Sequence, residues 1–455
     1  MDYEVEKHEK IYNFKDIHEM KKSRHNKVFL LAFIIFFTTG CGSDIVYNVE
    51  PDTSIEPVPQ TTITETHNEV SDASAISIGN TPFITTWKTD NEGISEDNQI
   101  FIDTEGTGYS YHVEWGDGKS DYNVTSDITH TYTMAGTYTI EITGDFPHMI
   151  FGDVYEESIF TTFLPFTSDN HKILSVEQWG NIKWLSMWKA FNDCKYLVSN
   201  AIDAPDLSLV NDFSNMFSGA EAFNQPINHW DVSNVTDMND MFSNAYTFNQ
   251  DLSSWNVSNV NSMANMFGGA DKFNQDISGW DVAKVVDMNG MFKYTSAFNQ
   301  DIGGWDVANV KFMYQMFSNA KEFNQDIGNW DVSNVDNMLW MFSSAEVFNQ
   351  DISRWDVSNV KSMAYMFSEA TSFDQNLSEW DVSNVVKMDL MFEKIRLSTD
   401  NYDALLHGWG RLELQQRVYF DAGSSQYSAS SQSARDALIN NYNWTINDGG
   451  MQVEM

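Results

Sequence analysis

The sequence is poor in cysteine and in basic residues. It has 2 cysteines, Cys41 and Cys194, in 455 residues, so no disulfide framework supports the fold. There are 26 lysine and arginine residues against 65 aspartate and glutamate residues, which gives a formal net charge of −39. Because such a surface repels phosphate backbones and anionic membrane faces, we expect no nucleic-acid partner. Cations and basic protein surfaces are the partners that this charge favours.

Common catalytic motifs are also missing. The 10 histidines are scattered, and the chain contains no H-E-x-x-H, no G-x-S-x-G and no glycine-rich phosphate loop. A glycosidase built from non-repeating carboxylates is the enzyme class that stays open. We predict a protein that is not an enzyme and needs no cofactor.

A long hydrophobic run is absent too. The apolar run from Val28 to Phe37 is far shorter than the about 20 residues that a membrane-spanning helix needs. A basic stretch precedes it and Thr39-Gly40-Cys41 follows, which is the order of a signal peptide. The small residues before Cys41 resemble the lipobox of bacterial lipoproteins, although Thr38 stands where that pattern has an aliphatic residue. The resemblance implies lipidation of Cys41; an ordinary secretory signal is the alternative.

These features divide the first part of the chain. We predict a lipoprotein signal peptide over residues 1–40, with Met20 as the true start, and a disordered tether over 41–80, which is rich in Thr, Ser, Glu, Pro and Asn. Short β-rich runs separated by turn signals predict a small all-β sandwich over residues 81–165, with strands at 109–115, 129–132 and 136–142. The sequence from Trp115 to Gly118, with His130-Thr-Tyr132 and Gly136-Thr-Tyr138, resembles the PKD-type domain. We interpret Asp117 as a turn residue, with a cation ligand as the alternative.

A 25-residue period dominates the rest of the chain. The unit is F-N-Q-D-I-x-x-W-D-V-S-N-V-x-x-M-x-x-M-F-x-x-A-x-x, and its tryptophan column is Trp230, Trp255, Trp280, Trp305, Trp330, Trp355 and Trp380. Apolar residues first follow a strand-like frame and then recur at steps of three and four, which indicates a helix. The expected fold is therefore an α/β repeat solenoid, leucine-rich-repeat-like, with a short strand plus a short helix per unit. We place it at 166–395, with a C-terminal α/β cap at 396–455.

The unit resembles the BspA-like leucine-rich-repeat surface proteins. Ala190-Phe191-x-x-Cys194-x-x-Leu197 is similar to a second form of the consensus of that family. The resemblance implies a cell-surface protein that takes part in adhesion and binds host or matrix proteins.

Polar columns inside the repeat have two explanations. We interpret the aspartates as caps of backbone N–H groups; bridging by calcium, with Asp281, Asp306, Asp331 and Asp356 as candidate ligands, is the alternative. The asparagine column that contains Asn334 predicts a ladder of turn hydrogen bonds. Cys194 stands in the column of small alanines, which predicts a packed residue rather than a reactive thiol.

Large residues replace small or polar ones between the paired methionines of the later repeats. They are Tyr314, Leu339, Trp340, Tyr365 and Leu390. We predict a binding patch there, and packing on a half-buried flank is the alternative. The chain as a whole predicts a monomeric lipoprotein of the bacterial outer membrane, attached by its lipid anchor alone, that binds a protein or another surface or matrix ligand. A purely structural envelope protein is the alternative function.

Overall fold

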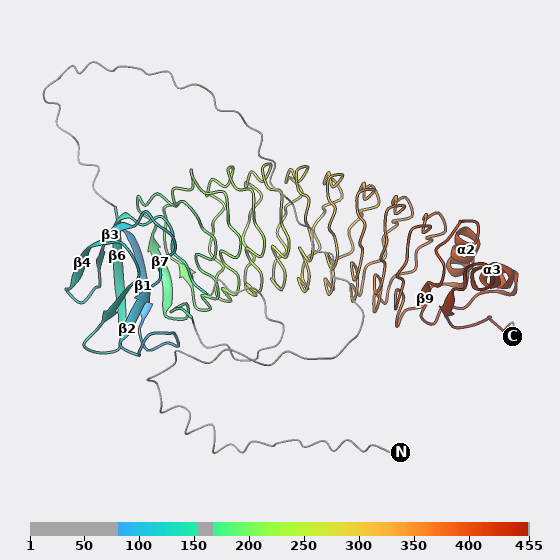
Figure 1. Ribbon diagram of the computed structural model, residues 1–455, viewed down its shortest axis with the longest axis horizontal. Helices are drawn as coiled ribbons and strands as arrows, with labels where there is room; N and C mark the ends of the chain where they lie inside the picture. Colours follow the sequence, from blue (N-terminus) through green and yellow to red (C-terminus); the bar gives the residue numbers. More distant parts are fainter. Residues whose placement is uncertain (1–80, 153–166, 454–455) are drawn as a thin grey trace, which may run out of the picture. The chain divides into compact units, whose positions relative to one another are not determined.

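The computed structural model describes residues 81–152 and 167–453 (Figure 1), which all fall in one compact unit of the chain. The predicted signal peptide, Cys41 and the predicted tether lie outside the described residues. In the described part, no helix is long and apolar enough to cross a membrane.

A mainly antiparallel sheet forms the first part of this unit. Its six strands lie in the order β4-β3-β6-β1-β7-β8, while β2 and β5 pair with each other in a separate two-stranded sheet. The strands are β1 (Phe83–Lys88), β2 (Gln99–Ile102), β3 (Ser110–Glu114), β4 (Ser120–Val124), β5 (Ile128–Thr131), β6 (Thr137–Asp145), β7 (Ile173–Gln178) and β8 (Val198–Ser199). The three strands expected from the sequence lie at β3, β5 and β6. Alternation along β1 buries Phe83, Thr85 and Trp87 on one face.

The sheet continues directly into the repeats. β7 pairs with β1 in antiparallel fashion and with β8 in parallel fashion, so that Ser175 lies opposite Val198. β7 and β8 belong to the segment that the sequence assigned to the solenoid. The first coil therefore shares backbone hydrogen bonds with the sheet, which covers the N-terminal end of the stack.

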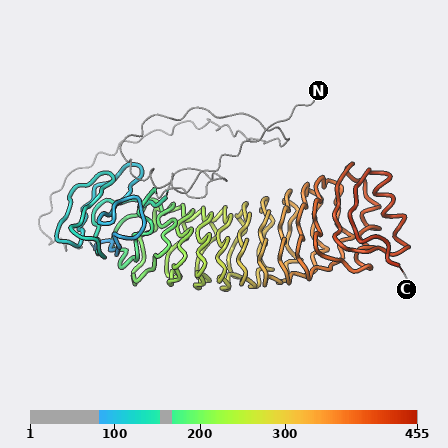
Figure 2. Tube along the Cα trace, turned by 90° about the horizontal axis from the view of Figure 1, so that it is seen from below, coloured from blue at the N-terminus to red at the C-terminus, as the bar shows by residue number. Residues whose placement is uncertain are grey.

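The repeats form successive coils, stacked side by side (Figures 1 and 2), but after β8 no coil contains a helix or an extended strand. Consecutive coils are joined by isolated parallel bridges such as Asp287↔Phe312 and Phe312↔Asn337, one repeat apart. The predicted strand plus helix per unit is therefore wrong, and with it the α/β fold class. The described body consists of small sheets and turns, with two short helices after the repeats.

The direction of the backbone N–H groups explains why the spacing of apolar residues wrongly predicted a helix in each repeat. In one coil Met241 and Ala245 donate to the carbonyls of Met238 and Phe242, three residues back. The N–H groups of the residues just before these two point along the stack instead: Asp240 donates to Ala264 O at 2.8 Å, and Asn244 to Gly268 O at 2.7 Å. An α-helix needs every N–H to bond four residues back along its own chain. Here tight turns produce the same apolar spacing, while every second N–H binds the next coil.

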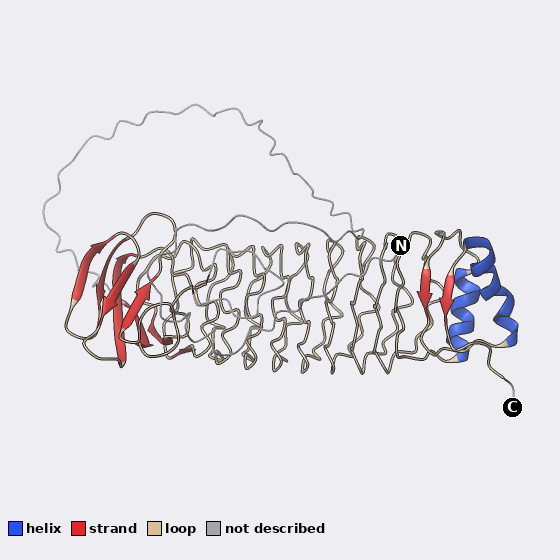
Figure 3. Ribbon diagram, turned by 60° about the horizontal axis from the view of Figure 1, so that its bottom comes forward, coloured by secondary structure: helices blue, strands red, loops and turns tan. Residues whose placement is uncertain are grey.

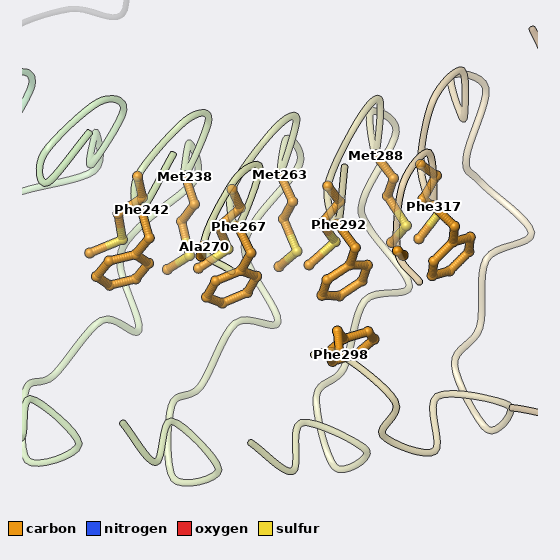
Figure 4. Packing of buried hydrophobic residues seen from close by; sticks show 14 of the residues in the cluster. Met238, Phe242, Met263, Phe267, Ala270, Met288, Phe292, Phe298 and Phe317 are labelled. Atoms are coloured by element: carbon orange, nitrogen blue, oxygen red, sulfur yellow. The ribbon is translucent and has the colours of Figure 1, made fainter. Parts of the chain in front are cut away.

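The core consists of the repeated aromatic and methionine columns. Phenylalanine rings stack in rows across coils: Phe242 and Phe267 have centroids 5.7 Å apart and planes 5° apart (Figure 4). Trp305 is 4% exposed, and its indole N–H donates to Ile277 O at 3.2 Å in the preceding coil. The whole tryptophan column is buried, and from Trp255 to Trp380 each indole also bonds its coil to the preceding one.

The C-terminal elements cover the last coil (Figure 3). They are α2 (Thr399–Trp409), β9 (Tyr419–Asp421), η2 (Ala429–Ser431), α3 (Gln432–Tyr442) and β10 (Thr445–Asn447), with β9 and β10 parallel. The Ser398 side chain caps α2 by accepting from the N–H of Asn401. Trp409 of α2 donates to Leu377 O at 3.1 Å, which continues the tryptophan ladder into the cap.

Candidate binding face

Many polar side chains of the repeats form hydrogen bonds that stabilise the coils themselves. Asp331 accepts the N–H of Ser333 at 3.1 Å. The same bond, to the N–H two residues on, is made by every other aspartate of its column and by every aspartate of a second column: Asp231, Asp281, Asp306, Asp356 and Asp381, and Asp251, Asp276, Asp301, Asp326 and Asp351. The hydroxyl and N–H of Ser333 also hold the pKa of Asp331 below its usual value. These bonds agree with the interpretation of the aspartates as backbone caps.

The calcium alternative concerns Asp281, Asp306, Asp331 and Asp356. All four are exposed, and each accepts a backbone N–H within its own turn. Over the described ranges 81–152 and 167–453, no three His, Cys, Asp or Glu side chains gather closely enough to hold a metal ion.

Two asparagine ladders bond the coils to each other. The predicted one is present: Asn334 Nδ2 donates to Ala308 O at 2.7 Å, in the preceding coil. The second follows the F-N-Q part of the unit and was missed. There Asn324 Oδ1 accepts the N–H of Asn349 at 2.9 Å and the side-chain amide of Gln350 at 3.0 Å. The Asn-Gln pair in unit after unit is the sequence signal that could have revealed it.

Two other predicted residues have scaffold roles. Cys194 is fully buried in the alanine column, as predicted, and burial raises the pKa of its thiol. Asp117 lies in the turn after β3, where it accepts the N–H of Lys119 at 3.1 Å and lies 3.1 Å from His130 Nε2. This geometry agrees with the interpretation of Asp117 as a turn residue.

Two backbone positions in each coil have left-handed dihedral angles, and the second, which includes Asn244, Gly269, Tyr294 and Glu369, lies four residues after the first. The first position bears on the predicted patch. We call it the left-handed column; its members are Asn215, Asp240, Asn265, Gly290, Gln315, Trp340, Tyr365 and Leu390, with φ between +51° and +58°. Asn, Asp and Gly tolerate this conformation, whereas bulky side chains rarely adopt it. The column thus changes from tolerant residues in the early coils to poorly suited ones in the late coils.

The predicted patch lies on and beside this column. We call Tyr314, Leu339, Trp340, Tyr365 and Leu390 the aromatic ridge. Tyr314 is 39% exposed, and the other four are half-buried. The rings of Trp340 and Tyr365 touch across two coils, with centroids 5.2 Å apart and planes inclined by 42°. The ridge residues thus occupy successive coils, and the contact of Trp340 with Tyr365 makes part of the ridge one apolar surface.

The backbone makes the ridge costly to the fold. A non-glycine residue in the left-handed region costs about 1–2 kcal/mol, and Asn or Asp much less. Trp340, Tyr365 and Leu390 carry this cost at three successive coils. Strain of this kind is concentrated at functional sites, where selection for something other than stability maintains it.

Sequence reasoning missed Phe312. It is 44% exposed and stands in a column otherwise held by polar residues such as Asp287, Asn337 and Ser362. Phe312 and Tyr314 are two residues apart on one coil, beside Leu339 and Trp340 of the next. The sequence could have revealed it, because Phe312 is a large apolar residue in an otherwise polar column and belongs to the same coil as Tyr314.

These features define a repeat protein of stacked turn-and-bridge coils with an apolar ridge on its later coils. The family model described as "Mycoplasma protein of unknown function, DUF285" matches residues 185–305 and 291–405. It is a BspA-like repeat family, so the BspA-like character of the repeats is confirmed in that region. No curated protein matches the chain significantly.

Proposed function

We propose that this chain is a cell-surface lipoprotein whose late coils bind a protein through the aromatic ridge. The observation that carries the proposal is the run of Trp340, Tyr365 and Leu390 in the left-handed column. Earlier coils form the same backbone with Asn265 or Gly290, so the fold does not need bulky side chains there. Exposed or half-exposed aromatic residues in one cluster are typical of binding surfaces.

Substitution by the residue that the early coils use separates binding from packing. Trp340→Asn with Tyr365→Asn places a left-handed-tolerant residue at both positions. Because relief of backbone strain offsets the packing that is lost, we expect the thermal midpoint to stay within about 2 °C of wild type. If the ridge is only packing on the flank of a structural envelope protein, the midpoint falls by several degrees.

Tyr294→Asn is the matched control. Tyr294 also has left-handed dihedrals, with φ of +59°, and is 53% exposed, but it belongs to a different column. A surface protein captured by the wild-type chain should be retained by Tyr294→Asn and lost by the Trp340/Tyr365 pair. Equal capture by all three chains would refute the ridge as the binding face.

The membrane anchor is the second part of the proposal. The order of basic run, short apolar run and Cys41 supports it, as does the stretch of polar residues that follows. The PKD-type assignment of residues 81–165 likewise remains a proposal, supported by its Trp115–Gly118 motif. Cys41→Ala should abolish fatty-acid labelling and release the chain from the cell envelope. Lipid labelling that persists in this variant would overturn the lipoprotein assignment.

A further inference from the structure

The charge of the ridge-bearing face changes from the early coils to the late ones. At the bridge column the early coils carry Asp212, Asp237, Ser262 and Asp287. The late coils carry Phe312, Asn337, Ser362 and Lys387 at the same positions. In a chain with a net charge of −39, this column thus has no carboxylate from Phe312 onward, although Asp336 and Asp389 stay exposed in the columns beside it.

Three exposed lysines accompany the ridge on one side. We call Lys311, Lys361 and Lys387 the lysine row; each stands three or four residues before the ridge residue of its own coil. Lys361 lies 3.8 Å from Asp336, with both side chains more than half exposed. Among the described residues, no carboxylate lies within 4.0 Å of the Lys311 or Lys387 ammonium group. Such exposed and weakly paired cations can be bridged by a partner at little cost.

On the opposite side of the ridge, the carboxylates already have hydrogen-bond or ion-pair partners within the protein. Glu369 accepts from the Ser344 hydroxyl at 3.2 Å and pairs with Lys394 of the next coil. Glu393 accepts from the Ser368 hydroxyl at 3.1 Å. These carboxylates bond neighbouring coils together, so the lysine row is the side of the ridge that has charge to offer a partner.

The shape of the ridge favours a polypeptide rather than a sugar. The Trp340 and Tyr365 rings are inclined by 42°, so they form an uneven surface rather than one flat platform. Leu339 and Leu390 offer aliphatic groups, which suit the apolar side chains of a protein partner. Four coils separated by about 4.8 Å give the ridge a length of about 14 Å, comparable to three turns of helix or four residues of strand.

We infer that the ridge binds a polypeptide segment with an apolar stripe, flanked on one side by Asp or Glu residues that meet the lysine row. This inference rests on the proposed function and adds the chemistry of the partner. The lysine row would then attract the acidic residues of the partner at the edge of the ridge, although the chain as a whole is strongly acidic. At physiological salt the screening length is about 8 Å, so a partner at the rim responds to the charges beside it, among them Lys311 and Lys387, more than to the net charge of the chain.

A peptide selection tests the inference without a known ligand. The probe is a display library of random 12-residue peptides, selected on the purified full-length chain and counter-selected on its Trp340→Asn/Tyr365→Asn variant. The enriched peptides should combine Trp, Phe or Leu with Asp or Glu. Lys311→Glu with Lys387→Glu should weaken them about tenfold, because each rim charge contributes modestly, and added salt should weaken them further.

The matched control reverses two positive charges away from the ridge. Lys272→Glu with Arg354→Glu makes the same change in net charge; Lys272 pairs with Asp271, and Arg354 lies beside Trp355 in another turn. Peptide affinity should then change less than twofold. An equal loss in both double variants would show a long-range charge effect and overturn the role of the lysine row.

Three further outcomes separate this inference from the proposed function. Ridge-dependent peptides that are neutral or basic would overturn the acidic flank and leave the ridge as a binding face. Binding of immobilised oligosaccharides that is lost in the Trp340/Tyr365 variant would overturn the polypeptide partner, again with the ridge intact. If neither peptides nor oligosaccharides distinguish that variant from wild type, both proposals fail.

Discussion

The repeats and the C-terminal cap satisfy their backbone in opposite ways. In α2 the N–H of Tyr402 bonds back to Ser398 O at 2.9 Å and the helix completes most bonds within itself. In the coils, Trp340 donates to Ala364 O and Tyr365 to Asp389 O, always one coil further on. A helix can therefore keep its hydrogen bonds alone, whereas each coil depends on the next. The stability of such a stack is approximately the sum of the interactions between neighbouring coils, and the terminal coils need caps to take the place of the missing neighbour.

Removal of the cap should have the largest effect. A chain that ends after residue 395 loses Trp409 and Phe420, which pack at the end of the stack, and leaves the Phe392 N–H without its partner, Asp421 O. The cap also buries Tyr402 and Trp444, and since each buried aromatic stabilises by roughly 1.5–3 kcal/mol, we expect a loss above about 5 kcal/mol. Hydrogen exchange should show the late coils opening first. Unchanged protection of residues 366–395 would contradict this account of the cap.

A single tryptophan in the middle of the stack should come next. Trp305→Ala removes a buried side chain and the bond from its indole to Ile277 O, so it should cost about 3–5 kcal/mol and loosen the adjacent coils first. Trp305→Phe is the control, because it keeps most of the volume and loses mainly the hydrogen bond, at about 1 kcal/mol. Urea denaturation measures both. Equal losses in the two variants would mean that the hydrogen bond, not the packing, stabilises this site.

The same contrast shows what could be predicted from the sequence. The period fixes which side chains share a column, so the burial of Trp305, the place of Cys194 and the Asn334 ladder were all predictable. These predictions concern side-chain position, which the repeat itself determines. In the cap, the α/β character expected for residues 396–455 agrees with helices α2 and α3 and the paired strands β9 and β10.

The secondary structure inside the unit was not predicted, because apolar spacing does not reveal where N–H groups point. The warning was in the columns of Asp240 and Asn244, whose counterparts include Asn265 and Gly269: residues that tolerate left-handed angles recur twice inside the supposed helix. The patch residues were found as departures from their columns. Their backbone strain could not be inferred, since it depends on the dihedral angles of the coil.

A reciprocal substitution sharpens the comparison between early and late coils. Asn265→Trp puts the residue of the late coils into the left-handed column of an early one, where φ is +51°. Without the Tyr365 neighbour that Trp340 contacts, the new side chain meets the full backbone cost, so we expect a loss of about 1–2 kcal/mol. Asn265→Gly, which keeps the conformation, should change the unfolding free energy by only a few tenths of a kcal/mol. If Asn265→Trp proves neutral, backbone strain no longer supports a functional origin for the ridge.

The smallest effect concerns two aspartates on the early coils. Burial raises the pKa of Asp237 and of Asp287, although each accepts a backbone N–H at 2.9 Å, from Asn239 and Asn289. A carboxyl whose pKa is raised on folding destabilises the fold while it is ionised, and this cost disappears as the pH falls through the raised pKa. Asn337 accepts the N–H of Leu339 at the equivalent position, so Asp237→Asn with Asp287→Asn should keep the hydrogen bonds and remove the charge.

We therefore expect the variant to melt about 1–2 °C above wild type at pH 7, and the two chains to converge below about pH 4. The exposed caps show the opposite dependence and provide the control. The pKa of Asp331 is lowered, so its contribution is present at neutral pH and is lost as the pH falls through that lowered pKa. Asp331→Asn should not melt above wild type at pH 7. Thermal melts of the three chains at both pH values decide the matter, and a gain for the Asp237/Asp287 variant that persists in acid would show that charge is not its cause.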